Sequence, residues 1–170
     1  MISTSQMLGK ELVCSSVTTI ARTLHTTLTG LVHFLYHEDV FAHILDDIRE
    51  LNLETDVSLI EAIVEDLEVH IPTAHGHRHR QRKQRRSLEL SLRHLHHSLD
   101  EIHQALQNFR SQMEAHRHLW FSYYRSFDTA SHLRLLRLCK RRLDHHFDRL
   151  VKVHQLFVPA PAPAPLFKMD

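Results

Sequence analysis

The sequence predicts an all-α fold: an antiparallel helical bundle of four to five helices with a long coiled C-terminal hairpin. Apolar residues recur at three- and four-residue spacing along most of the 170-residue chain, the period of amphipathic helices. Glycine occurs only three times, and four of the five prolines lie beyond residue 158, so few turn residues remain for a sheet. This length corresponds to one domain.

The first predicted helix covers residues 1–36 and the next two apolar runs cover 39–51 and 55–71. The first helix is rich in Ser and Thr, so its packing must contribute more than its intrinsic propensity. The phase slips at Asn52, so the two later runs form either two helices or one kinked helix. Pro72 ends the second of them. The inward residues of the three segments are Leu12, Val13, Val17, Ile20, Leu24, Leu28, Leu31 and Leu35, then Val40, Phe41, Ile44, Leu45, Ile48 and Leu51, then Val57, Ile60, Val64, Leu67 and Ile71.

The predicted hairpin covers residues 87–157. From Leu88 its apolar residues alternate at spacings of four and three, which is typical of a long helix–helix contact. His116 takes the one position of this apolar seam that is neither apolar nor aromatic, and we expect it to set the helix register rather than bind a ligand. Asp128 can cap the second helix. The seam consists of Leu88, Leu92, Leu95, Leu99, Ile102, Leu106, Phe109, Met113, Trp120, Tyr123 and Phe127, and the second helix contributes Ala130, Leu133, Leu136, Leu143, Phe147, Leu150 and Phe157.

We therefore expect residues 1–157 to form one helical bundle with a basic linker at 72–86, unless the long helix begins as early as Gly76. Residues 158–170 form an extended Pro-Ala tail, because alternating proline favours polyproline II. The tail carries an apolar tip and is a candidate docking segment. Its docking residues are Pro159, Pro161, Pro163, Pro165, Leu166 and Phe167.

The net charge of +1 conceals a division between two regions. Residues 38–75 carry eleven acidic residues and one basic residue, a net of −10, and residues 76–157 carry seventeen basic and seven acidic residues, a net of +10. Either the acidic helices pack on the basic hairpin, which is the simpler interpretation, or the basic face binds an external polyanion. No aromatic residue interrupts the basic run, so it offers no base-stacking platform. The candidate polyanion-binding residues are Arg78, Arg80, Arg82, Lys83, Arg85 and Arg86.

The densest aromatic cluster lies at the predicted corner of the hairpin. It either seals the end of the bundle or anchors a protein partner, because Trp, Tyr and Arg dominate interface hot spots. Four aromatic side chains within five residues cannot all face one core, so some should touch a partner or another part of the chain. The cluster consists of Trp120, Phe121, Tyr123, Tyr124 and Arg125.

No phosphate loop, nucleophile motif or zinc-protease motif occurs, so the sequence favours a non-enzymatic protein with no cofactor. His75, His77 and His79 have metal-ligand spacing, but no cysteine lies near them to build a closed zinc site, and no metal is expected. Cys14 and Cys139 are read as reduced thiols. The basic neighbours of Cys139 would lower its pKa, but no base accompanies it, so an inert thiol is favoured.

The sequence shows no signal-peptide pattern and no apolar run of 18 residues. We expect a protein without a transmembrane segment that acts inside a cell, in the cytoplasm or nucleus, or inside a virus particle, and that is not secreted. Protein partners or self-association are expected, and nucleic acid is the other candidate partner.

Four segments resemble a group of short helical proteins of nucleocytoplasmic large DNA viruses. A Trp/Phe-Ser-x-x-Arg corner and a final Leu-Asp-x-Arg-Phe-Asp-type helix recur in that group. Here the final motif reads Leu143-Asp144-His145-His146-Phe147-Asp148, with His146 where the group has Arg. The resemblance implies a helical fold, a viral origin and a structural or interaction role, such as a subunit or accessory of a viral particle. The segments are LNLETDVSLIEAIVEDL, LELSLRHLHHSLDEIHQALQNF, HRHLWFSYYRS and LRLLRLCKRRLDHHFDRLVKV.

The helix count and the late basic helix also resemble four-helix bundles of the HeLo type and of the necroptosis pseudokinase. Such bundles act on membranes or as signalling oligomers. No specific motif carries this second resemblance.

The 18 histidines predict that acid loosens the fold. If all of them were protonated below a pKa of about 6.5, the formal charge would rise from +1 to +19, and self-repulsion would destabilise the compact state. Thermal melts followed by circular dichroism should give a lower Tm at pH 5 than at pH 7.5. An unchanged Tm would contradict this prediction.

Overall fold

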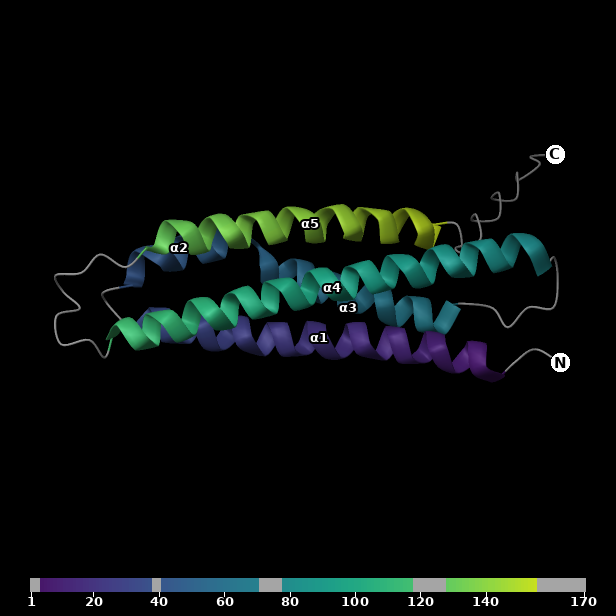
Figure 1. Ribbon diagram of the computed structural model, residues 1–170, viewed down its shortest axis with the longest axis horizontal. Coiled ribbons are helices and arrows are strands. Elements are labelled where there is room, and N and C mark those ends of the chain that lie inside the picture. Colours follow the sequence, from purple (N-terminus) through teal and green to yellow (C-terminus); the bar gives the residue numbers. More distant parts are fainter. Residues whose placement is uncertain (1–3, 38–40, 71–77, 118–127, 156–170) are drawn as a thin grey trace, which may run out of the picture.

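The computed structural model describes residues 4–37, 41–70, 78–117 and 128–155. Within these ranges the chain forms helices and no strand, so the predicted all-α bundle is confirmed (Figure 1). The helices are α1 (Thr4–His37), α2 (Ala42–Glu50), α3 (Leu53–His70), α4 (Arg78–Arg117) and α5 (Thr129–Gln155).

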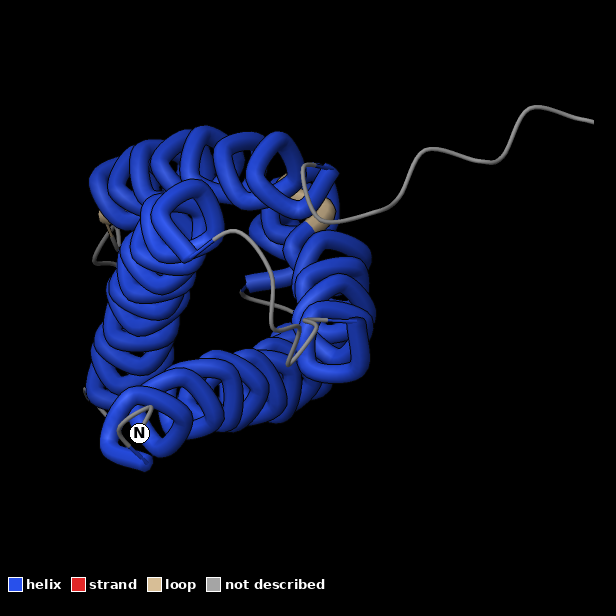
Figure 2. Tube along the Cα trace, turned by 90° about the vertical axis from the view of Figure 1, so that its right-hand side faces the viewer, coloured by secondary structure: helices blue, strands red, loops and turns tan. Residues whose placement is uncertain are grey.

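The helices form two antiparallel hairpins that lie side by side. One consists of α1 with the α2–α3 pair and the other of α4 with α5, and the end-on view shows the four rods around a common axis (Figure 2). Thr27 of α1 contacts His103 of α4, and Arg110 lies against Gly30, so α1 and α4 run in the same direction. The bundle is therefore antiparallel within each hairpin, as predicted, and parallel between the hairpins.

Three contacts fix the register of α4 against α5. Gln112 Oε1 lies 2.8 Å from His132 Nε2, Glu101 binds Arg142 at 3.1 Å, and the rings of His94 and His146 lie 5.2 Å apart. Residue numbers fall along α5 as they rise along α4, which confirms the predicted antiparallel hairpin.

The apolar seam of α4 packs as the heptad pattern predicted. Its residues from Leu88 to Met113 are all buried. Ser91, Ser98 and Ala105 are buried too. They share a face of α4 with Glu101, and the contact between Glu101 and Arg142 shows that this face meets α5. Small side chains at heptad spacing allow the two helix backbones to approach closely.

The buried stripe of α1 differs from the predicted stripe at two places, and at each of them the buried residue is the next one along the chain. Cys14 and Ala21 are fully buried, whereas Val13 and Ile20 are only partly buried at the edge of the core. The other predicted residues of this stripe from Val17 onward are buried, namely Val17, Leu24, Leu28, Leu31 and Leu35. Two small residues thus take the sites nearest the neighbouring helices.

The acidic segment forms two helices, which decides between the alternatives left open. Asn52 lies between them with a φ of 51°, a left-handed conformation that asparagine tolerates better than most residues. Its N–H donates to the Arg49 carbonyl at 3.0 Å and its carbonyl accepts from Asp56 at 3.2 Å. The predicted inward residues Phe41 to Leu67 are buried.

The start of α5 has the predicted cap. The Ser131 N–H donates to Asp128 Oδ1 at 3.2 Å, and hydrogen bonds from the Ser131 side chain and backbone lower the pKa of Asp128. The predicted inward position of Ala130 is wrong, because this residue is exposed and Cys139 is buried instead.

The basic linker predicted at 72–86 is wrong from residue 78 onward. α4 begins at Arg78, so the basic run occupies its first turns, close to the early start that the sequence also allowed. Arg78, Arg80 and Arg82 are helical in their backbone, and Lys83, Arg85 and Arg86 are exposed.

The acidic and basic regions of the chain meet along one side of α5. Asp47 Oδ1 lies 2.6 Å from Arg137, Asp56 Oδ2 lies 2.9 Å from Lys140 Nζ, and Asp66 Oδ2 lies 2.8 Å from His154 Nε2. We call these three pairs the polar seam. They show that the acidic α2–α3 pair packs on a basic helix, as the simpler interpretation of the charges predicted.

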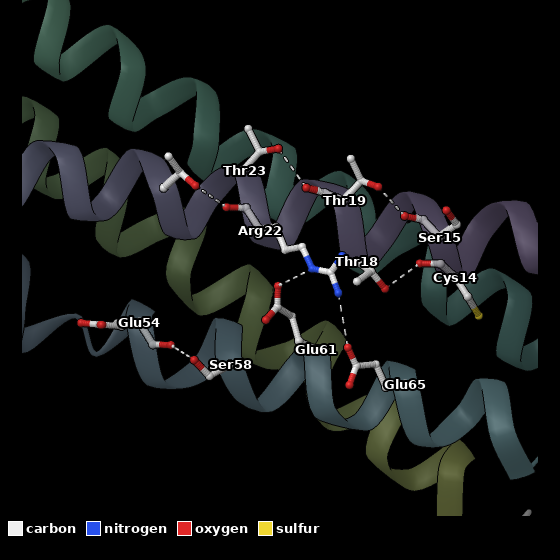
Figure 3. Close-up of polar contacts among 11 residues, drawn as sticks. Cys14, Ser15, Thr18, Thr19, Arg22, Thr23, Glu54, Ser58, Glu61 and Glu65 are labelled. Atoms are coloured by element: carbon white, nitrogen blue, oxygen red, sulfur yellow. Dashed lines mark hydrogen bonds and ion pairs between the residues drawn. The ribbon is translucent and has the colours of Figure 1, made fainter.

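A polar contact also joins α1 to α3. Arg22 lies 4.0 Å from Glu61 and 3.5 Å from Glu65 (Figure 3). On the same helix the hydroxyls of Thr18, Thr19 and Thr23 donate to backbone carbonyls four residues earlier. These local bonds satisfy the hydroxyls that the Ser- and Thr-rich sequence places on α1.

The close approach of α4 and α5 predicts that Ser98→Leu destabilises the protein. Ser98 is 2% exposed, and overpacking a tight helix contact costs about 1–3 kcal/mol. Urea unfolding measures the change, with Ser87→Leu at an exposed site of the same helix as the control. Equal unfolding midpoints for the two variants would contradict the tight contact.

Candidate functional site

The N-terminal turns of α4 form a concentrated positive surface. Lys83, Arg85 and Arg86 are exposed, and the first turn of the helix contains no acidic residue. The helix macrodipole adds partial positive charge at the same end. Cations at a helix N-terminus repel this partial charge. An anion bound there would offset both the charge of the side chains and the charge of the dipole.

α5 adds two further cations to this surface. Because His146 lies opposite His94 and the helices are antiparallel, Arg149 and Lys152 lie further toward the start of α4, by about 4.5 and 9 Å at 1.5 Å per residue. Both are exposed. We call Lys83, Arg85, Arg86, Arg149 and Lys152 the cationic end. Sequence reasoning named the α4 residues alone, although the antiparallel hairpin would have identified the other two.

Three cations in the middle of α5 are paired inside the bundle. Arg137 and Lys140 take part in the polar seam, and Arg142 binds Glu101. Lys140 also donates to Asp144. Burial would lower the pKa of Lys140, but the hydrogen bonds to Asp144 and Asp56 outweigh burial and raise it. The charge of this part of α5 is therefore used inside the bundle.

The outward face of α5 carries a pair of exposed leucines. Leu135 is 43% exposed and Leu138 is 40% exposed, one helical turn apart. Arg134 and Arg141, both exposed, flank Leu138 on the same helix. We call Leu135 and Leu138 the leucine pair. No residue of this pair was predicted as a partner-binding site.

A group of histidines lies where α4 meets α5. The ring of His146 lies 5.2 Å from that of His94 and 5.5 Å from that of His145. His97 Nε2 lies 3.5 Å from Glu101, which also binds Arg142. Burial, with the nearby His94 and His145, lowers the pKa of His146. This contact also depends on the hairpin register and was not predicted.

His116 lies half-buried at the end of α4. Its ring contacts Phe41 edge-on, with centroids 6.3 Å apart. The histidine therefore touches the residue that precedes α2. Its predicted role in setting the register stays a prediction.

A shallow hollow lies where the turn between α2 and α3 faces α5. Its volume is about 620 Å³, and its lining includes Asn52, Asp56, Lys140 and Arg141. Lys140 and Asp56 bind each other there. Among the residues that the structure describes, no set of three or more His, Cys, Asp or Glu side chains is placed to hold a metal ion.

The aromatic cluster at Trp120 to Arg125 and the tail residues Pro159 to Phe167 lie outside the described residues. The predictions of partner binding at the corner and of docking by the tail therefore stay predictions. Of the predicted polyanion-binding residues, the side chains of Lys83, Arg85 and Arg86 are described.

Comparison with protein-family models, with curated protein sequences and with solved structures finds no match. In the described part of the chain, no helix is both long enough and apolar enough to cross a bilayer. These findings leave the surfaces of the bundle as the basis for a functional proposal.

Cys139 has the properties of an inert thiol. It is 4% exposed, and burial raises its pKa, with a further contribution from Glu101 that outweighs the opposite effect of Arg142. Of the basic neighbours, Arg142 does lower the pKa, as the sequence suggested, but burial has the larger effect and the pKa rises overall.

The raised pKa of Cys139 predicts slow alkylation. In a Cys14→Ser background, iodoacetamide at pH 8 should modify the native protein more slowly than the unfolded chain, because burial shields the Cys139 thiol and raises its pKa, which lowers the thiolate fraction. Mass spectrometry of timed samples measures the rate. Equal rates in the native and unfolded states would contradict the burial of this thiol.

Proposed function

We propose that the protein is a non-enzymatic structural or interaction protein, a subunit or accessory of a larger assembly inside a cell or a virus particle. The observation that carries the proposal is the leucine pair on the outward face of α5. The sequence resemblance to helical viral proteins supports a particle as the assembly.

The leucine pair has the character of a protein interface. The other large apolar residues that are exposed in the described ranges, Tyr36, Leu59 and Leu90, each stand alone on their helices. Among the residues whose burial is described, α5 alone combines two such residues on adjacent turns, with arginines beside them. Arginine is enriched in interfaces, and a partner that covered the two leucines would remove their apolar surface from water.

The position of α5 leaves this face open to a partner. One side of the helix packs on α4, and the other meets α2 and α3 through the polar seam. Leu138 lies on the side of α5 away from both contacts, whereas Leu135, one heptad before Arg142, lies at the edge of the α4 contact and is still 43% exposed. We take a second copy of the same chain as the partner, because self-association can be tested with the purified protein alone.

The proposal predicts self-association that depends on the leucine pair. Light scattering over a range of concentrations should show oligomers of the wild-type chain and monomers of the Leu135→Asp/Leu138→Asp variant. Leu59→Asp on α3 is the matched control and should assemble like the wild type. A wild type that stays monomeric at every concentration, or variants that all assemble alike, would contradict the proposal.

A second candidate function is polyanion binding by the cationic end. The observation that favours it is that the fold adds Arg149 and Lys152 of α5 to the basic first turns of α4. Neither of these two α5 residues takes part in the polar seam. The phosphates of nucleic acid are the polyanion that lysine and arginine side chains of this kind neutralise.

Polyanion binding predicts a steep dependence on salt. Each phosphate contact contributes a slope of about −0.9 in log K against log[salt], so Arg149→Gln/Lys152→Gln should make the slope about two units shallower. Fluorescence anisotropy with labelled DNA measures it. Arg134→Gln/Arg141→Gln, which changes the same charge elsewhere on α5, is the control and should leave the slope unchanged. A wild-type affinity that does not depend on salt would exclude this function.

A further inference from the structure

The contact between His94 and His146 joins the two helices of the C-terminal hairpin at a point that neither proposed function uses. The two imidazoles come from α4 and α5, and their ring centroids lie 5.2 Å apart with an angle of 44° between the ring planes. Both side chains are half-buried, so they are neither sealed in the core nor fully hydrated.

One atom of this pair lacks the hydrogen bond that its position demands. Nδ1 of His146 is buried from solvent and has no hydrogen-bond partner. A buried polar atom without a partner is costly, and each such atom in a folded protein calls for an explanation. A bound ligand that accepts the lone pair of this nitrogen would explain why the atom has no hydrogen-bond partner.

The spacing of the rings fits two imidazoles on one metal ion. With a metal–nitrogen distance of about 2.0–2.1 Å, each ring centroid lies about 3.2 Å from the metal, and a tetrahedral angle then places the two centroids about 5.2 Å apart. The observed separation of His94 and His146 equals this value. The ring of His145 is nearly as close to His146, at 5.5 Å.

The nearby carboxylate of Glu101 is already engaged, which leaves the imidazoles as the protein ligands here. Glu101 is engaged by Arg142 at 3.1 Å and by His97 at 3.5 Å, so it is not available as a third ligand in this arrangement. The described residues contain no set of three ligands, which makes this a two-ligand site completed by water. Imidazole prefers borderline cations such as Zn²⁺ and Cu²⁺ to Mg²⁺ or Ca²⁺.

We propose that His94 and His146 form an open two-histidine site for a borderline divalent cation, with Zn²⁺ as the reference ion. Such a site bridges α4 and α5 and stabilises the hairpin when it is filled. The proposal stands apart from the assembly and polyanion-binding functions, because it involves neither the leucine pair nor the cationic end.

The stabilisation by zinc gives the first test. At a zinc concentration ten times Kd, binding to the folded state should raise the Tm of the wild-type chain by about 3–6 °C. His94→Asn and His146→Asn should each lose this increase, while His96→Asn, a half-buried histidine two residues from His94, should keep it. Circular dichroism without zinc shows which variants fold, and His146→Gln replaces any asparagine variant that does not.

A second measurement locates the site among the 18 histidines of the chain. Diethyl pyrocarbonate modifies free imidazoles, and peptide mass spectrometry reports each position separately. Zinc should slow the modification of His94 and His146 at least fivefold and leave His96 unchanged. Zinc protection that maps only to other histidines, or a Tm increase that survives in both His94→Asn and His146→Asn, would overturn the proposal.

Discussion

The ion pair between Lys140 and Asp56 is the most buried of the polar contacts that hold the acidic helices against α5. The Lys140 side chain is only 16% exposed, and it keeps its charge because carboxylates of α3 and of its own helix surround the ammonium group. A charge buried to this degree is tolerated only with such partners. Together with Asp47–Arg137 and Asp66–His154, it sets how the acidic helices lie along α5.

This internal pairing decides which charges remain for a partner. The polar seam and the Glu101–Arg142 pair engage Arg137, Lys140 and Arg142 of α5, and the cationic end lies outside these pairs, where α4 begins and α5 ends. The same packing turns the leucine pair outward. Both candidate surfaces therefore lie on the C-terminal hairpin, outside the apolar core and outside the polar seam.

Periodicity and charge counts were sufficient to predict the bundle, the long hairpin and the Asp128 cap, because each of these depends on residues close in sequence. Cys14 and Ala21 were missed because a stripe of large apolar residues hides the small ones that lie at the closest contacts. The sequence left the start of α4 open between a linker at 72–86 and an early start at Gly76, and a run of cations, which opposes the dipole at a helix N-terminus, gives no local signal for the observed start at Arg78.

The candidate sites were less predictable than the fold. Arg149 joins the cationic end, and His94 meets His146, only through the register between two helices, which no local pattern specifies. The pKa of Cys139 rises although its sequence neighbours are basic, because burial is a property of the packed structure. The corner and the tail, where the sequence also predicted partner binding, lie outside the described residues.

A double-mutant cycle on Asp56 and Lys140 tests the central claim most directly. Urea unfolding of the wild type, Asp56→Asn, Lys140→Met and the double variant gives the coupling free energy between the two side chains. Contacting residues in one ion-pair network couple by about 0.5–3 kcal/mol, and the partial burial of this pair predicts a value of about 1 kcal/mol or more. Single-variant effects that add to within about 0.3 kcal/mol would contradict the claim that this pair holds α3 against α5.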